Sequence, residues 1–181
     1  MLFNNNFFKN AITGVIAPHG ITDLFHAEQN NLIPQLYSIN LLTVISTLAI
    51  DKFNHPLLEI IFYSISAYHF RNDMPDIKNI NPFFISVAML SSFFLFDPKL
   101  FIYYMIFIHV PNHYLMNWDV LKNDKKRSIL IISLTSVISM FIGTTDLIEN
   151  HLVQTISQGL IFSHIIYEES FIFSNTTKTI E

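Results

Sequence analysis

Cysteine is absent from the 181 residues of this chain, which excludes disulfides, thiolate metal ligands and a cysteine nucleophile. Any metal ion must therefore be bound by His, Asp or Glu side chains. Charged residues are also scarce, at 13% against 51% hydrophobic residues, and this balance argues against a water-soluble domain. The net charge of −4 provides no basic surface, so we exclude a nucleic-acid partner.

Long apolar runs without charge, such as residues 82–96 and 128–143, concentrate the hydrophobic residues into segments that are typical of membrane helices. We expect an all-α fold, a polytopic transmembrane bundle of about seven helices, that forms a single integral membrane domain over residues 1–181. The third and fourth spans are short enough to be re-entrant instead. The predicted spans are residues 7–22, 32–50, 55–70, 82–96, 99–118, 128–148 and 151–173.

Lysine and arginine divide unevenly between the two sides of such a bundle. Because cytoplasmic loops carry the excess of positive charge, the division predicts an outside amino terminus and a cytoplasmic carboxyl terminus in a membrane that the sequence does not identify. The three on the amino-terminal side are Lys9, Lys52 and Lys99, and the seven on the other side are Arg71, Lys78, Lys122, Lys125, Lys126, Arg127 and Lys178.

The histidines gather at one predicted depth. His19, His69, His109, His113 and His164 all lie toward the same end of odd-numbered spans, where ionisable residues point to function. His55 and His151 instead open their spans at the opposite face, where interfacial histidine is ordinary, and we do not expect them to be ligands.

His109 and His113 form the motif H-V-P-N-H, whose i,i+4 spacing directs two imidazoles from one helical face toward one ion. Pro111 removes a backbone donor between them, which predicts a kink beside the pair. The pair by itself is equally consistent with core histidines bonded to backbone or hydroxyl groups.

Acidic residues accompany the other histidines along the sequence. Asp23 follows His19, Asp73 follows His69, and Glu168 follows His164. A metal-bound imidazole commonly donates its second N–H to a carboxylate, so these acids suit that role, although each is also typical of a charge that ends a membrane helix. The resulting candidates for supporting the ligands are Asp23, Asp73, His164 and Glu168.

The strings A-P-H-G-I-T-D-L-F-H at 17–26, S-A-Y-H-F at 66–70 and H-V-P-N-H at 109–113 resemble the Brp/Blh family of membrane β-carotene 15,15′-dioxygenases. The chain is shorter than members of that family generally are, and it has Arg71 where a glycine is expected. The resemblance implies oxidative cleavage of a membrane-dissolved carotenoid by O2 to retinal, which a retinal-binding protein would then receive. It also implies a catalytic non-haem Fe(II) held by His19, His69, His109 and His113.

Two alternatives stay open. A membrane di-iron hydroxylase or desaturase also combines membrane helices with histidine boxes, although this chain has one H-x-x-x-H and no H-x-x-H-H. A non-enzymatic protein that binds a metal or a carotenoid is the other alternative. A seven-helix retinal protein is excluded, because residues 151–173 contain no lysine for a Schiff base. Imidazole ligands suit zinc and copper as well as iron, so residue type alone does not identify the metal.

Overall fold

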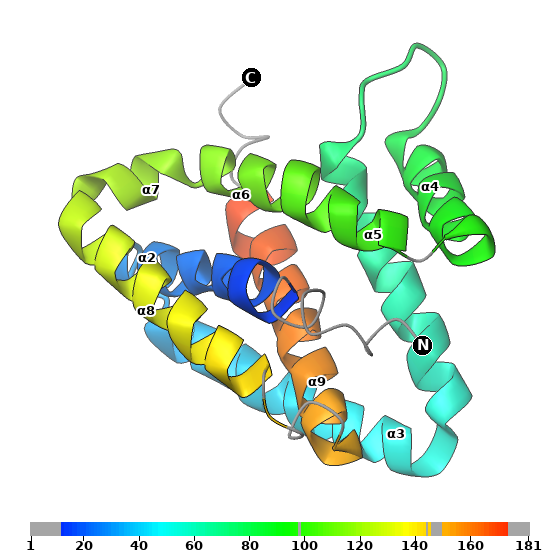
Figure 1. The fold of residues 1–181 in the computed structure, drawn as a ribbon, viewed down its shortest axis with the longest axis horizontal. Helices are drawn as coiled ribbons and strands as arrows, with labels where there is room; N and C mark the ends of the chain where they lie inside the picture. Colours follow the sequence, from blue (N-terminus) through cyan, green and yellow to red (C-terminus); the bar gives the residue numbers. More distant parts are fainter. Residues whose placement is uncertain (1–11, 98, 144, 146–149, 174–181) are drawn as a thin grey trace. The chain divides into compact units, whose positions relative to one another are not determined.

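The computed structural model describes residues 12–97, 99–143, 145 and 150–173. Helices form nearly all of this part of the chain, and none of it forms a β-strand (Figure 1). The prediction of an all-α fold is therefore confirmed. The start of the first predicted span, residues 7–11, and the end of the sixth, residues 146–148, lie outside the described residues, as do Lys9 and Lys178.

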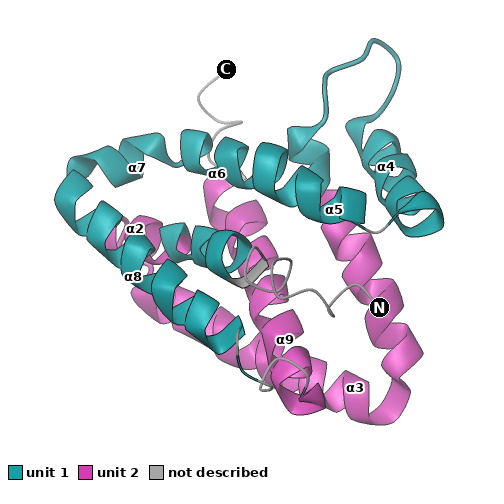
Figure 2. Cartoon of the chain, in the orientation of Figure 1, with its two compact units in different colours: residues 1–22, 70–148 teal, residues 23–69, 149–181 magenta. Residues whose placement is uncertain are grey.

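The chain divides into two compact units, each built from two separate stretches of sequence (Figure 2). Unit 1 comprises Met1–Thr22 and Phe70–Ile148, and unit 2 comprises Asp23–His69 and Glu149–Glu181. The prediction of a single membrane domain stays a prediction.

The helices of unit 2 are α2 (Thr22–Gln29), α3 (Ile33–Phe70), α9 (His151–Tyr167) and the π-helix η7 (Glu168–Phe173). The first residue of α2, Thr22, and the last residue of α3, Phe70, belong to unit 1. Helix α2 occupies a stretch that the sequence analysis left as a connection between spans. Asn31 joins α2 to α3 with a φ of 59°, a left-handed conformation that asparagine tolerates at the end of a helix. The backbone N–H of Leu32 then donates to the carbonyl of Ala27 at 2.7 Å.

Helix α3 is two helices joined at Asn54, whose φ of −159° and ψ of 78° are not helical. Asn54 Oδ1 accepts a hydrogen bond from the backbone N–H of Leu57 at 3.2 Å and so caps the second half. Pro56 lies in the first turn after the break, where its missing N–H costs no helical hydrogen bond. The separation predicted between residues 32–50 and 55–70 therefore appears as this break, at which α3 changes direction (Figure 1).

Unit 2 is held together by a small apolar core and by close helix packing. Ala27, Leu36 and Tyr167 are buried together, so that α2, α3 and the end of α9 share this core. Further along α9, a Cβ added at Gly159 would lie 2.8 Å from the Cα of Val44 on α3. Glycine therefore permits the two backbones to approach closely, as small residues do between membrane helices.

In unit 1, the short helices η2 and η3 come from the first stretch of sequence, and the other helices come from the second. The segment 7–22 was predicted as a membrane helix, and its described part is helical but mainly π and 3-10. The segment predicted at 99–118 is also not one continuous α-helix but a series of helical segments. The elements are η2 (π, Ile12–Ile16), η3 (3-10, Ala17–Ile21), η4 (3-10, Arg71–Asp73), α4 (Pro82–Phe96), α5 (Lys99–Tyr104), η5 (π, Met105–His109), α6 (Val110–Met116), α7 (Trp118–Asn123) and α8 (Lys125–Gly143).

Local sequence accounts for the ends of several of these elements. Asn81 Oδ1 accepts the backbone N–H of Phe83 at 2.9 Å, and Pro82 follows at the first helical position, so α4 starts where the apolar run begins. Arg71 opens the short helix η4 that carries Asp73. Helix α8 packs along η2 and along η3, which carries His19.

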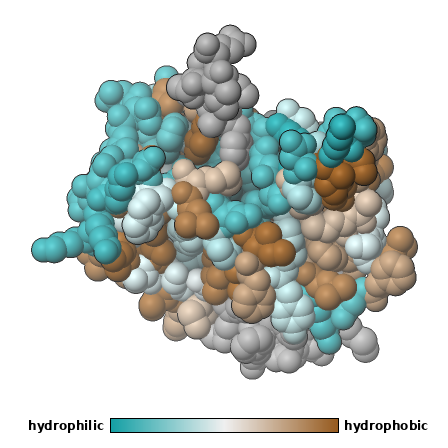
Figure 3. All heavy atoms as spheres, turned by 90° about the horizontal axis from the view of Figure 1, so that it is seen from above, coloured by the Kyte–Doolittle hydropathy of each residue, from teal (hydrophilic) through white to brown (hydrophobic). Residues whose placement is uncertain are grey.

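Within the described residues, two helices are long and apolar enough to cross a membrane, Ile33–Asp73 and Lys125–Gly143, and Pro82–Phe96 is a shorter apolar helix. An unbroken helix over the first range would measure about 60 Å, twice the hydrocarbon thickness, and Asn54 breaks it near its middle. Large apolar side chains are exposed along α8, among them Leu130, Val137 and Phe141. Hydrophobic residues also reach the surface on the face drawn in Figure 3. These features support association with a membrane.

Candidate metal centre

Three of the four predicted ligands lie together in unit 1. His19 comes from η3, His109 from the end of η5 and His113 from α6, and all three are buried. The ring centroid of His19 lies 5.3 Å from that of His109 and 5.0 Å from that of His113, and the last two are 6.3 Å apart.

These ring separations fit binding to one ion. A nitrogen bound about 2.1 Å from a metal puts its ring centroid about 3.2 Å from it, so two rings on one ion lie about 4.5–6.4 Å apart. All three distances fall within that range. The ring separations in unit 1 are therefore compatible with one shared divalent cation.

Asp73 orients the ring of His109. His109 Nδ1 donates to Asp73 Oδ2 at 2.7 Å, Tyr104 Oη donates to the same oxygen at 2.6 Å, and Asn112 Nδ2 donates to Oδ1 at 3.3 Å. With its Nδ1 carrying the hydrogen, His109 has its lone pair on Nε2. This is the arrangement by which a carboxylate fixes the tautomer of a metal-binding imidazole.

His19 is held in a similar way, but by backbone. Its Nδ1 donates to the carbonyl of Ile16, one turn earlier, which reserves Nε2 for an ion. Thr22 Oγ1 donates to the carbonyl of His19 at 2.9 Å and lies 3.4 Å from Nε2 and 3.5 Å from Nδ1 of His113. Asn117 Nδ2 donates to the carbonyl of His113 at 3.0 Å and so fixes the turn that carries this histidine.

Departures from α-helical geometry lie beside these histidines. The π-helix η2 precedes His19, and the π-helix η5 ends at His109. Because Pro111 cannot donate to the carbonyl of Phe107, the regular hydrogen-bond ladder is interrupted here. The disturbance predicted from Pro111 thus takes the form of a π-helical turn, a feature that occurs frequently at functional sites.

His69, the fourth predicted ligand, belongs to unit 2 and contacts different side chains. Its Nε2 lies 3.5 Å from Glu168 Oε2, and its Nδ1 lies 3.6 Å from Glu169 Oε1. The His69 ring is 5.7 Å from that of His164.

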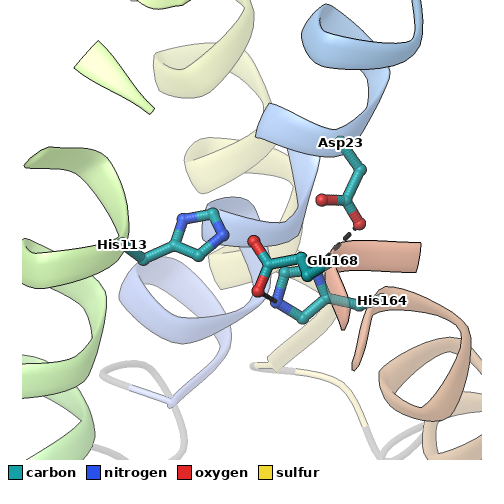
Figure 4. A group of neighbouring side chains, drawn as sticks. All are labelled: Asp23, His113, His164 and Glu168. Atoms are coloured by element: carbon teal, nitrogen blue, oxygen red, sulfur yellow. Dashed lines mark hydrogen bonds and ion pairs between the residues drawn. The ribbon is translucent and has the colours of Figure 1, made fainter. Parts of the chain in front are cut away.

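A buried group of potential ligands surrounds His164 in unit 2. His164 Nδ1 donates to Asp23 Oδ2 at 2.8 Å, and His164 Nε2 lies 3.6 Å from Glu168 Oε2 (Figure 4). Ligand atoms of Asp23, His164 and Glu168 all lie within 4.8 Å of one another, so these side chains can take part in holding a metal ion.

Two of the supporting acids contact histidines that are distant from them in sequence, whereas Glu168 lies beside His164, its neighbour in sequence. Asp73 contacts His109, and Asp23 contacts His164. Sequence reasoning missed Tyr104 and Asn112 as partners of Asp73. Asn112 could have been found, because it lies inside the H-V-P-N-H motif, whereas nothing in the local sequence marks Tyr104.

The two histidines expected not to be ligands lie together in unit 2. His55 Nδ1 contacts Asp51 Oδ1 at 2.7 Å, and His151 Nε2 contacts Asp51 Oδ2 at 3.0 Å. Both rings are exposed, unlike those of the buried clusters. Exposed pairs of this kind contribute little to stability, and water competes for the ring nitrogens.

Comparison with known proteins yields no match among family models, curated proteins or solved structures.

Proposed function

We propose that this chain is an integral membrane non-haem iron oxygenase that cleaves β-carotene or a related carotenoid at its central double bond to give retinal. The observation that carries the proposal is the buried cluster of His19, His109 and His113, with Asp73 orienting His109. Neutral imidazoles suit Fe(II), and three of them leave positions open for other ligands.

The chain's own residues supply position and environment. His19 and His109 each donate one N–H to a fixed acceptor, so their Nε2 atoms are the ones that would bind the ion. Burial of the three rings keeps bulk water from the reacting double bond. The bound iron would supply the activation of dioxygen. One oxygen atom enters each new aldehyde when the double bond breaks, so the reaction requires no separate reductant.

Membrane insertion follows from the same proposal, because a long polyene dissolves in the bilayer and reaches the site from there. We propose seven crossings or re-entrant segments with the carboxyl terminus in the cytoplasm. The test is a reporter fused to the carboxyl terminus that is active only in the cytoplasm. An inactive reporter on a correctly inserted protein would mean that the carboxyl terminus lies outside, which would refute the proposed orientation.

The test of activity is expression in a bacterial host that produces β-carotene, followed by chromatography of the extracted pigments. The parent should convert carotene to retinal, and His113→Ala should lower conversion by more than about 100-fold, above the loss typical of residues that only support a ligand. His151→Ala, which changes an exposed histidine, is the matched control and should convert like the parent. Unchanged carotene with a folded, iron-loaded parent would refute the proposal.

A membrane hydroxylase or desaturase is the second candidate. The observation that favours it is the group of Asp23, His164 and Glu168, because the chain offers more histidine and carboxylate ligands than one iron requires. Such an enzyme would need a reductant, and its product would keep the carbon skeleton. Mass spectrometry of the extracted lipids distinguishes a hydroxylated or desaturated product from retinal.

A further inference from the structure

Glu168 has the geometry of a central ligand between two histidines of unit 2. Its Oε2 lies 3.5 Å from His69 Nε2 and 3.6 Å from His164 Nε2. Two atoms bound about 2.1 Å from one ion are about 3.4 Å apart at tetrahedral angles. The observed separations exceed that value slightly, and the rings of His69 and His164, 5.7 Å apart, fall within the range calculated above for rings on one ion.

The outer nitrogens of the same two rings face other carboxylates. His164 Nδ1 donates to Asp23 Oδ2 at 2.8 Å, and His69 Nδ1 lies 3.6 Å from Glu169 Oε1. Each imidazole therefore has one nitrogen toward Glu168 and the other toward an acid. Asp23, which accepts the Nδ1–H of His164, fixes the tautomer that leaves the inner nitrogen of this ring unprotonated, as metal-binding histidines require, and Glu169 lies on the corresponding side of His69.

Backbone geometry brings Glu168 to this place. His164 and Glu168 are four residues apart and share a face where α9 ends and η7 begins. The π-helical geometry of η7 starts at Glu168 itself, so a change in helix type occurs at the central ligand, as it does at His109 in unit 1.

Charge and burial also favour a cation in this cluster. Asp23 and Glu168 are 4% and 0% exposed, and Glu169 is next to Glu168 in sequence. Buried carboxylates are costly unless positive charge compensates them. A divalent cation between the two imidazoles and Glu168 supplies that charge and leaves both rings neutral.

We propose that His69, His164 and Glu168 bind a second divalent cation of the Fe(II) class, with Asp23 and Glu169 orienting the two histidines. Two imidazoles and one carboxylate are a common ligand set for such an ion and leave positions open for water or another ligand. The site goes beyond the proposed carotenoid cleavage and does not depend on it. It also assigns His69 to an ion other than the one held by His19, His109 and His113.

The test is metal binding by the full-length protein in detergent, measured by elemental analysis and by Co(II) titration after chelator treatment. The parent should bind two ions per chain. Glu168→Gln and His164→Asn should each bind one ion, and Asp23→Asn should lower the affinity for the second ion by about 10–100-fold. His109→Ala should lose the other ion and keep this one. Glu59→Gln, which changes an exposed acid of α3, is the matched control and should bind two.

Glu168→Gln preserves size, so it tests the ligand with little disturbance of packing, and a sharp unfolding transition verifies its fold. One ion per chain in the parent, unchanged by Glu168→Gln and His164→Asn, would overturn the second site and leave only a protonated histidine to balance the acids. A second ion lost equally in Glu59→Gln would overturn it as well. Pigment conversion is measured separately, so an active one-ion parent would refute this site alone, whereas an inactive two-ion parent would refute the proposed function alone.

Discussion

Replacing Asp73 with asparagine should weaken the binding of metal to unit 1 while the protein stays folded. Asp73 accepts hydrogen bonds from His109 at 2.7 Å, from Tyr104 at 2.6 Å and from Asn112 at 3.3 Å. Asparagine keeps the size of the side chain, but it removes the negative charge and leaves one acceptor oxygen in place of two. Nothing then holds His109 as firmly in the tautomer whose lone pair is on Nε2.

The size of the effect follows from these contacts. Residues that hold a metal-binding imidazole by its second N–H contribute about 10–100-fold to affinity, which corresponds to about 1.4–2.7 kcal/mol. The free energy of unfolding should fall by about 1–3 kcal/mol, because buried donors lose a charged acceptor. A competition titration with Co(II) and a chelator measures the affinity, and chemical denaturation measures the stability.

Asp76→Asn is the control, because Asp76 is an exposed acid three residues further along the chain. It should match the parent in both measurements. If Asp73→Asn bound cobalt as tightly as the parent while His109→Ala lost it, Asp73 would stabilise the fold without orienting the ligand, and the reasoning would be refuted.

Three further predictions concern unit packing, pH and the exposed histidines. Gly159→Ala should lower the free energy of unfolding by about 1–3 kcal/mol, because the added Cβ would lie 2.8 Å from the backbone of Val44. Gly14→Ala should be tolerated, because there the added Cβ meets only the flexible side chain of Met140. Equal losses of stability for the two variants in chemical denaturation would contradict this reasoning. Burial lowers the pKa of His26 by more than the charges of Asp23 and Glu168 raise it. The unfolded state therefore binds more protons at this residue than the folded state does. The contribution of His26 to the free energy of unfolding should be complete above about pH 6.5 and should be lost as the pH falls below that value. His26→Gln should flatten that dependence in thermal unfolding at several pH values, and an unchanged slope would exclude His26 as its source. His55→Ala and His151→Ala should have the same metal content as the parent in elemental analysis, because both rings are exposed and contact Asp51. Loss of an ion in either variant would show that the replaced histidine is a metal ligand.

Sequence patterns were sufficient for the features that depend on local chemistry. Uncharged apolar runs placed α4 and α8, and the polar interruption near Asn54 anticipated the break in α3, because a hydrophobic segment and a cap are properties of neighbouring residues. The common depth predicted for His19, His109 and His113 likewise agrees with the burial of their rings near one another in unit 1. The helix α2 was missed, because its mixed polar and apolar residues carry no span-like run.

The partners of each histidine were decided by tertiary structure. A pattern along the chain assigns Asp73 to His69 and Asp23 to His19, but folding brings Asp73 to His109 across 36 residues and Asp23 to His164 across 141. Pro111 marked a disturbance beside His109, but nothing in the sequence predicted the π-helical turn at Glu168, since it depends on which hydrogen bonds the packed chain can keep. The sequence by itself therefore determined the helical, apolar character of this protein and its supply of histidine ligands. Only the tertiary structure decided which carboxylate orients which imidazole, because that choice depends on contacts between helices that are distant along the chain.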